Sequence, residues 1–264
     1  MTNAAKLLTA LTGATLLACA SPSYADPPAT PGGAGDFRYQ KTLTAPMRLE
    51  VKDLNGSITV EPASGDALEV IAVKSGPDAT RVQILAREEG GAILLCALWP
   101  GHDAASCKAG ASLQGDRGHV DATVDFKIRL PARVSALNAS TVNGRVRAAG
   151  VRGDAEVSTM NGAIDVEATG KVSAHTMNGA MHVRAAAGRE VHLETTNGAI
   201  EVSLPAAAAA DVEASTTNGR ISSDFVEVPP PAIPALHSAR FKIGAGGTVV
   251  SLHTTNGDVH VRKL

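Results

Sequence analysis

The chain has 264 residues, a formal net charge of −2, and 3% aromatic against 44% hydrophobic side chains. This length suits one large β domain or two small ones, and the scarcity of aromatic rings argues against an ordinary β-sandwich core. Basic residues are not clustered, which excludes nucleic acid as an expected partner and leaves a lipid anchor as the expected route to a membrane.

Residues 1–25 have the pattern of a signal peptide. Lys6 is their single charged residue, and an apolar stretch too short for a spanning helix follows it. Two cleavage sites compete: Ser23-Tyr24-Ala25 suits an ordinary signal peptidase, while Leu16-Leu17-Ala18-Cys19 resembles a lipobox in which Cys19 would be lipidated. Both predict export to the periplasm, the outer membrane or the cell surface.

Three segments are expected to follow one another along the chain. After the signal peptide, residues 26–36 are rich in Pro, Gly and Ala and predict a flexible linker. Alternating apolar residues then begin, so residues 37–264 are expected to form one β-repeat domain.

Cys96 and Cys107 flank a short loop that contains the single tryptophan, Trp99. In an oxidising compartment this pair is predicted to form a disulfide, which would stabilise the fold by about 2–3 kcal/mol on the chain-entropy model. A metal site with His102 as third ligand is the alternative, but the spacing and the lack of a second Cys or His pair argue against it.

Alternating apolar residues predict strands throughout the chain, and no stretch has a helical period. Before the repeats, strands are expected near 47–51, 58–60, 68–73, 82–85, 93–95 and 120–130. The run 206–210 of alanines is too short for a helix and should be a connection. Pro229–Pro234 is expected to be an insertion loop, and 241–250 a coil that has lost its Asn-Gly pair.

The phrase Thr-x-Asn-Gly-x-apolar occurs six times, and a seventh, divergent copy contains Asn55-Gly56. Successive asparagines in the six copies lie 18, 17, 19, 21 and 38 residues apart, and the last interval is twice 19. A steady period of this length is typical of a repeat architecture. The predicted corners are Asn143-Gly144, Asn161-Gly162, Asn178-Gly179, Asn197-Gly198, Asn218-Gly219 and Asn256-Gly257.

Asn-Gly between alternating strands fits two architectures. In an antiparallel hairpin meander, Thr159 would pair with Ile164 and Val157 with Val166. In a parallel β-solenoid with coils of 17–21 residues, Asn-Gly would form a sharp corner by adopting positive φ, and like residues would stack in ladders. The recurrence of the same residue types at the same positions favours the all-β parallel solenoid.

The repeats, together with a Cys-Ala-Leu-Trp-Pro…Cys segment and a VDFKIRLP strand, resemble a bacterial "putative adhesin" β-strand repeat family. The resemblance covers residues 47–264. It implies an exported, solenoid-like protein similar to autotransporter adhesin heads, in a domain of unknown function with no established catalytic residues.

Polar residues on the expected strands are interpreted as solvent-facing. His175 and His253 share one slot, three residues before an asparagine, and this slot otherwise holds Ser or Glu, so a surface position is favoured over a metal site. The acidic residues that follow the corners (Asp165, Glu201 and Asp258) lack the spacing of a calcium loop. No catalytic or cofactor-binding motif occurs, so we expect neither an enzyme nor a cofactor.

The sequence therefore predicts a non-catalytic binding or structural repeat protein of the bacterial cell envelope, adhesin-like, whose partner is an envelope protein or a glycan. A periplasmic accessory protein that acts in envelope stress through protein contacts is the alternative. A carbohydrate-active β-helix enzyme ranks third, because charges are dispersed singly along the strands.

Overall fold

The structure, a computed structural model, describes residues 36–110, 120–228 and 237–264. The expected signal peptide, Cys19, the linker up to residue 35 and the Pro229–Pro234 loop lie outside these residues. Asp36, which we assigned to the linker, begins the first strand.

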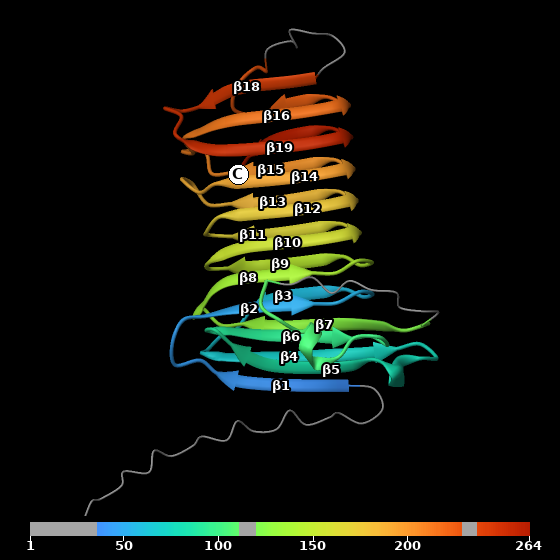
Figure 1. The fold of residues 1–264 in the computed structure, drawn as a ribbon. Helices are drawn as coiled ribbons and strands as arrows, with labels where there is room; N and C mark the ends of the chain where they lie inside the picture. The colour runs from blue at the N-terminus through green and yellow to red at the C-terminus, as the bar shows by residue number, and fades with distance from the viewer. Residues whose placement is uncertain (1–35, 111–119, 229–236) are drawn as a thin grey trace, which may run out of the picture.

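Two sheets of ten strands each face one another in the described part of the chain (Figure 1). Sheet A contains, in spatial order, β1 (Asp36–Thr42), β4 (Ala67–Ser75), β7 (Thr123–Leu130), β3 (Ile58–Pro62), β9 (Val146–Val151), β11 (Ile164–Ala168), β13 (Met181–Ala185), β15 (Ile200–Leu204), β20 (Val259–Lys263) and β17 (Ile221–Ser223). Sheet B contains β18 (His237–Ile243), β16 (Ala210–Asn218), β19 (Thr248–Asn256), β14 (Val191–Asn197), β12 (Val172–Asn178), β10 (Asp154–Asn161), β8 (Val134–Ser140), β2 (Met47–Lys52), β6 (Ala92–Leu98) and β5 (Gln83–Glu89). The helical elements among the described residues are two short 3₁₀ turns, Ala79–Arg81 and Ala104–Ser106.

Each coil runs along sheet B, turns at Asn-Gly and returns along sheet A. Strand β10 therefore pairs in parallel with β8 and β12 of the neighbouring coils, and β11 pairs in parallel with β9 and β13. Asn161 lies opposite Asn178, and Ile164 lies opposite Met181. This pairing confirms the parallel solenoid and excludes the hairpin meander, in which β10 would pair with β11.

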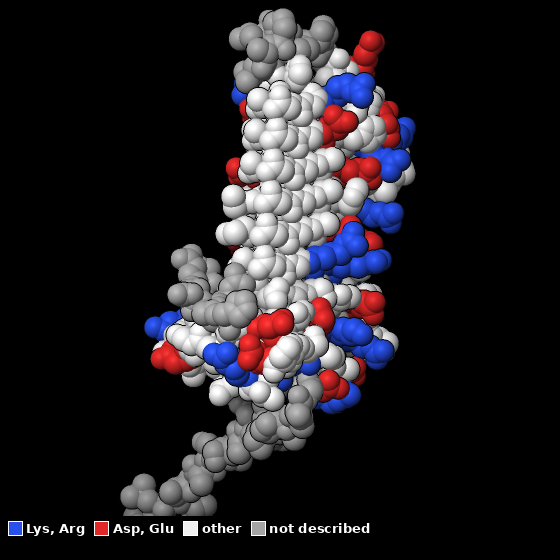
Figure 2. Space-filling view, turned by 90° about the vertical axis from the view of Figure 1, so that its right-hand side faces the viewer, with Lys and Arg blue, Asp and Glu red and all other residues white. Residues whose placement is uncertain are grey.

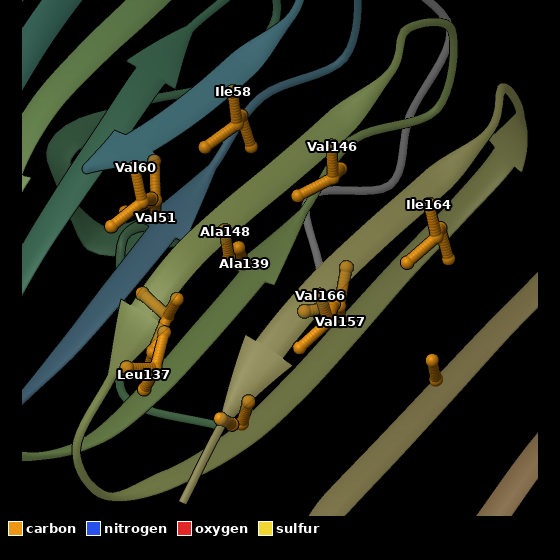
Figure 3. Packing of buried hydrophobic residues seen from close by; sticks show 14 of the residues in the cluster. Val51, Ile58, Val60, Leu137, Ala139, Val146, Ala148, Val157, Ile164 and Val166 are labelled. Atoms are coloured by element: carbon orange, nitrogen blue, oxygen red, sulfur yellow. The ribbon is translucent and has the colours of Figure 1, made fainter. Parts of the chain in front are cut away.

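The core fills the narrow space between the sheets. Alternate residues of every coil point inward, as Val157 of β10 and Ile164 and Val166 of β11 do (Figure 3). Burying each Val, Ile or Leu side chain contributes about 1.5–3 kcal/mol. The large rings Trp99 and Phe126 are buried at the N-terminal end, where the extra antiparallel strands lie. Small aliphatic side chains suffice elsewhere, which explains the low aromatic content.

At the C-terminal end, the order of coils in space differs from their order along the chain. Strand β19 lies between β14 and β16, and β20 lies between β15 and β17, so the last coil of the chain is inserted between two earlier ones. Our expectation of a coil at 241–250 is wrong. Instead, β18 pairs antiparallel with β16 at the end of sheet B, and β19 starts at Thr248.

The N-terminal end has the same arrangement. The coil formed by β2 and β3 lies between the β6–β7 coil and the β8–β9 coil. Strands β5, β4 and β1 then extend the two sheets in antiparallel pairing. Open parallel edges are sites of unwanted strand addition. At this end both sheets continue in antiparallel strands, whereas at the other end β18 covers the parallel edge of sheet B and β17 is the last described strand of sheet A.

Glycine is required at the corners mainly because neighbouring coils approach closely. A Cβ atom added to Gly162, Gly179 or Gly198 would lie 1.9–2.0 Å from the carbonyl oxygen of the equivalent glycine in the preceding coil. The expected positive φ at asparagine is wrong, since no described residue other than glycine has positive φ. Backbone proximity, rather than a left-handed turn at asparagine, therefore fixes the sequence of the corner.

Gly179→Ala should lower the free energy of unfolding by at least about 2 kcal/mol, because its Cβ would force adjacent coils apart. Gly65→Ala is the matched control, since a Cβ there meets no atom within 4 Å. Urea denaturation followed by circular dichroism measures both variants. Equal stability of the two variants would contradict the close approach of the coils.

Candidate functional surfaces

The predicted corner residues form a continuous hydrogen-bonded ladder. In the stacking order Asn143, Asn161, Asn178, Asn197, Asn256, Asn218, each asparagine after the first donates its Nδ2–H to the Oδ1 atom of the preceding one, at 2.7–2.8 Å. The preceding threonines are buried and donate to glycine carbonyls, as Thr176 does to Gly162 at 3.2 Å. These side chains hold the coils together, so the corner residues have a structural role.

A column without charged side chains runs along this edge of the molecule (Figure 2). On this edge Met160 and Met177, the residues before Asn161 and Asn178, are 46% and 50% exposed. Threonines 196, 217 and 255 occupy the same position in the coils nearer the C-terminal end.

The outer face of sheet A carries a groove that spans β9, β11, β13, β15 and β20. It has a volume of about 510 Å³ and is rich in basic side chains. We call it the arginine groove, after its basic residues Arg145, Arg147, Arg184, Arg262 and Lys263.

Acidic residues in the groove neutralise only part of this charge. Arg145 pairs with Asp165 at 2.9 Å, and Arg262 pairs with Glu201 at 3.1 Å. Arg147 and Arg184 form no ion pair with another described residue, so their guanidinium groups are available to an anionic ligand. Of the acidic residues that we singled out in the sequence, Asp165 and Glu201 line this groove, whereas Asp258 accepts a hydrogen bond from the Arg220 backbone at 2.8 Å.

Histidines gather on the outer face of sheet B. His175 lies opposite Glu194 in the next coil, and His253 lies beyond Glu194 in the same row. His192 is two residues before Glu194, and its ring centroid is 5.4 Å from that of His175. One ligand atom from each of His175, His192 and Glu194 lies within 4.8 Å of the other two. We call these three residues the histidine cluster.

The surroundings of His192 favour the neutral form of its ring. Partial burial lowers the pKa of His192, and the nearby His175 lowers it further, whereas Glu194 acts in the opposite direction. From the sequence we expected His192 on the outward face of its strand and Glu194 in the same surface slot as His175 and His253, but we did not expect His175, His192 and Glu194 to come together. The signal was present, since residues 192 and 194 of one repeat align with 173 and 175 of the previous one.

The loop that contains the cysteines is fastened to β2 by polar contacts. Cys96 and Cys107 are bonded in the structure, with their Cα atoms 6.0 Å apart. Buried Lys52 pairs with Glu50 at 3.2 Å, and Glu50 accepts a hydrogen bond from the Gly110 backbone at 2.9 Å. Because both sulfur atoms are in the disulfide, neither is available for the alternative metal site with His102.

Asp53, just after β2, is the most perturbed acid in the described part of the chain. Its Oδ1 atom accepts a hydrogen bond from the Trp99 indole at 3.2 Å, whereas its buried Oδ2 atom has no hydrogen-bond partner among the described residues. Burial raises the pKa of Asp53 to about 7, against the opposing effect of nearby backbone N–H groups and of Trp99. Its ionised form is therefore disfavoured in the folded state.

Asp53 should make the protein less stable as the pH rises from about 4 to about 7. The ordinary pKa of an aspartic acid is 3.8 and that of folded Asp53 is about 7, so the ionised form costs on the order of 4 kcal/mol above pH 7 and nothing below pH 4. Asp53→Asn should remove this dependence and unfold at higher urea concentration than the wild type at pH 8. The exposed Asp121→Asn is the control. Parallel pH profiles for the wild type and Asp53→Asn would refute the assignment.

Comparison with known proteins identifies the family to which this chain belongs. The profile of the Toastrack family, DUF4097, matches residues 47–262. No curated protein matches the chain. Among the described residues, no helix has the length and hydropathy needed to cross a membrane.

Solved structures with similar folds are distant in sequence. A "putative cell adhesion protein" from Clostridium sporogenes is 10% identical with a TM-score of 0.50, and the match covers 86% of this chain and 99% of that one. A "putative adhesin" from Bacteroides fragilis is 11% identical with a TM-score of 0.37, covering 87% and 97%. At this identity the first of these supports the fold alone. The match over residues 47–262 spans most of the sequence, and the chain belongs to the Toastrack DUF4097 family.

Proposed function

We propose that this protein is an exported, non-catalytic binding protein of the bacterial cell envelope, adhesin-like, and that its ligand is an acidic glycan bound in the arginine groove. The observation that carries the proposal is the presence of two arginines, Arg147 and Arg184, that have no ion-pair partner among the described residues in a groove crossing five strands. The chain as a whole has a net negative charge, so this basic surface is a local feature.

The groove has the dimensions and chemistry of a polymer site. Neighbouring strands are about 4.8 Å apart, so five strands span roughly 19 Å, the length of several sugar units. Guanidinium groups bind carboxylates through two parallel hydrogen bonds. The neighbouring carboxylates of Asp165 and Glu201 can accept hydrogen bonds from sugar hydroxyls.

Three further observations support a binding role outside the cytoplasm. The Clostridium sporogenes structure with a similar fold is described as a "putative cell adhesion protein". Residues 1–25 have the pattern of a signal peptide, and the Cys96–Cys107 bond suits an oxidising compartment. Membrane attachment would occur through lipidated Cys19.

Binding to polygalacturonate, an acidic polysaccharide, should be measurable by isothermal titration calorimetry at low salt, with no binding to neutral dextran. The double variant Arg147→Ala/Arg184→Ala should bind at least about tenfold more weakly, because it loses two unpaired cations. Arg87→Ala/Arg240→Ala removes the same charge from sheet B and should bind as the wild type does. Equal weakening in both double variants would show that net charge, and not the groove, determines binding.

The location of the protein tests the export part of the proposal. The native gene and a Cys19→Ala variant should be expressed, fractionated, labelled with palmitate and tested by protease shaving of whole cells. Labelled wild type that is shaved from the surface supports the adhesin-like role. Protected protein in the periplasm favours the accessory role in envelope stress. Unprocessed protein in the cytoplasm would contradict export.

A further inference from the structure

We propose that the histidine cluster on sheet B binds one divalent transition metal ion of the zinc class, with His175, His192 and Glu194 as ligands. The proposal is independent of the arginine groove, which lies on the other sheet. It depends on the parallel register of β12 and β14, because that register brings together three outward-facing side chains from two coils.

The geometry is close to that of a metal site before the ion binds. The three ligand atoms lie within 4.8 Å of one another, and the Nδ1 atom of His175 is 3.6 Å from a carboxylate oxygen of Glu194. Tetrahedral zinc with bonds of about 2.0–2.1 Å needs ligand atoms roughly 3.4 Å apart. Rotation of these half-exposed side chains is sufficient to close the remaining gap.

The surroundings orient the rings. The Nε2 atom of His175 lies 3.1 Å from the Ser173 hydroxyl, which holds the ring with Nδ1 towards Glu194. Such hydrogen bonds to the non-ligating nitrogen are common in zinc sites.

The chemistry of the ligands selects the class of metal. Two imidazoles and one carboxylate suit Zn²⁺ and its neighbours, whereas Ca²⁺ and Mg²⁺ prefer sites made entirely of oxygen ligands. Three protein ligands leave one position on the solvent side for water or for a donor atom from a bound partner.

Sheet A provides an internal comparison. His182 lies 3.9 Å from Glu201, and His260 is the next residue in the same row. His182, Glu201 and His260 do not bring three ligand atoms together, since the histidine cluster is the one such group among the described residues. A single histidine beside a carboxylate therefore serves as a matched control.

The test uses Co²⁺ as a spectroscopic probe and Zn²⁺ as its competitor, with metal-free protein that carries no histidine tag. The wild type should bind one Co²⁺ per chain with visible ligand-field absorption, and Zn²⁺ should abolish that absorption. His192→Ala and Glu194→Gln should each weaken binding at least about tenfold. His182→Ala should leave binding unchanged.

Circular dichroism melts without metal separate a lost ligand from a lost fold, and the surface variants should melt as the wild type does. The proposal is overturned if the wild type binds no Co²⁺, or if His192→Ala and Glu194→Gln retain its affinity. Equal weakening by His182→Ala would also overturn it, because binding would then be nonspecific adsorption to exposed histidines.

Discussion

The close approach of backbones at the Asn-Gly corner is the constraint on which the rest of the structure depends. Gly179 lies so near to the carbonyl group of Gly162 that no side chain fits between the coils. That carbonyl group also accepts a hydrogen bond from the hydroxyl of Thr176, and the side chain of Asn178 donates a hydrogen bond to that of Asn161. The glycine contact, the threonine hydrogen bond and the asparagine hydrogen bond all require the same register between successive coils. Inward apolar residues consequently fall opposite each other, and outward polar residues form straight rows.

The two ends of the stack depend on a different device. A stack of parallel coils leaves open edges, and each would invite another chain to pair with it. This protein inserts its first and last coils inside the stack and places antiparallel strands outside them, β18 at one end and β1, β4 and β5 at the other. The terminal coils are thereby held on both sides. Loss of β20, although it is last in the chain, would separate β15 from β17.

The repeat was sufficient to predict the parallel coils and their corners, because the same residue types recur where ladders need them. It could not predict the inserted coil, since Asn256-Gly257 matches the motif as well as Asn218-Gly219 does, and strand order depends on long-range pairing. The arginine groove and the histidine cluster depend on cross-strand neighbours, such as Ser173 opposite His192, which appear only when successive repeats are aligned. The burial of Asp53 depends on Trp99, 46 residues away in the sequence.

One architecture thus presents two outer faces of different chemistry, basic on sheet A and rich in imidazole on sheet B, separated by an uncharged edge. The Asn-Gly corners are joined to neighbouring coils by hydrogen bonds. Residue-resolved amide hydrogen exchange tests this bonding most directly, because the N–H groups of Gly162, Gly179 and Gly198 donate to asparagine carbonyls of the next coil, each at 2.9 Å. These amides should be protected as strongly as those of the central strands. Exchange at the rate of exposed turns would contradict the account.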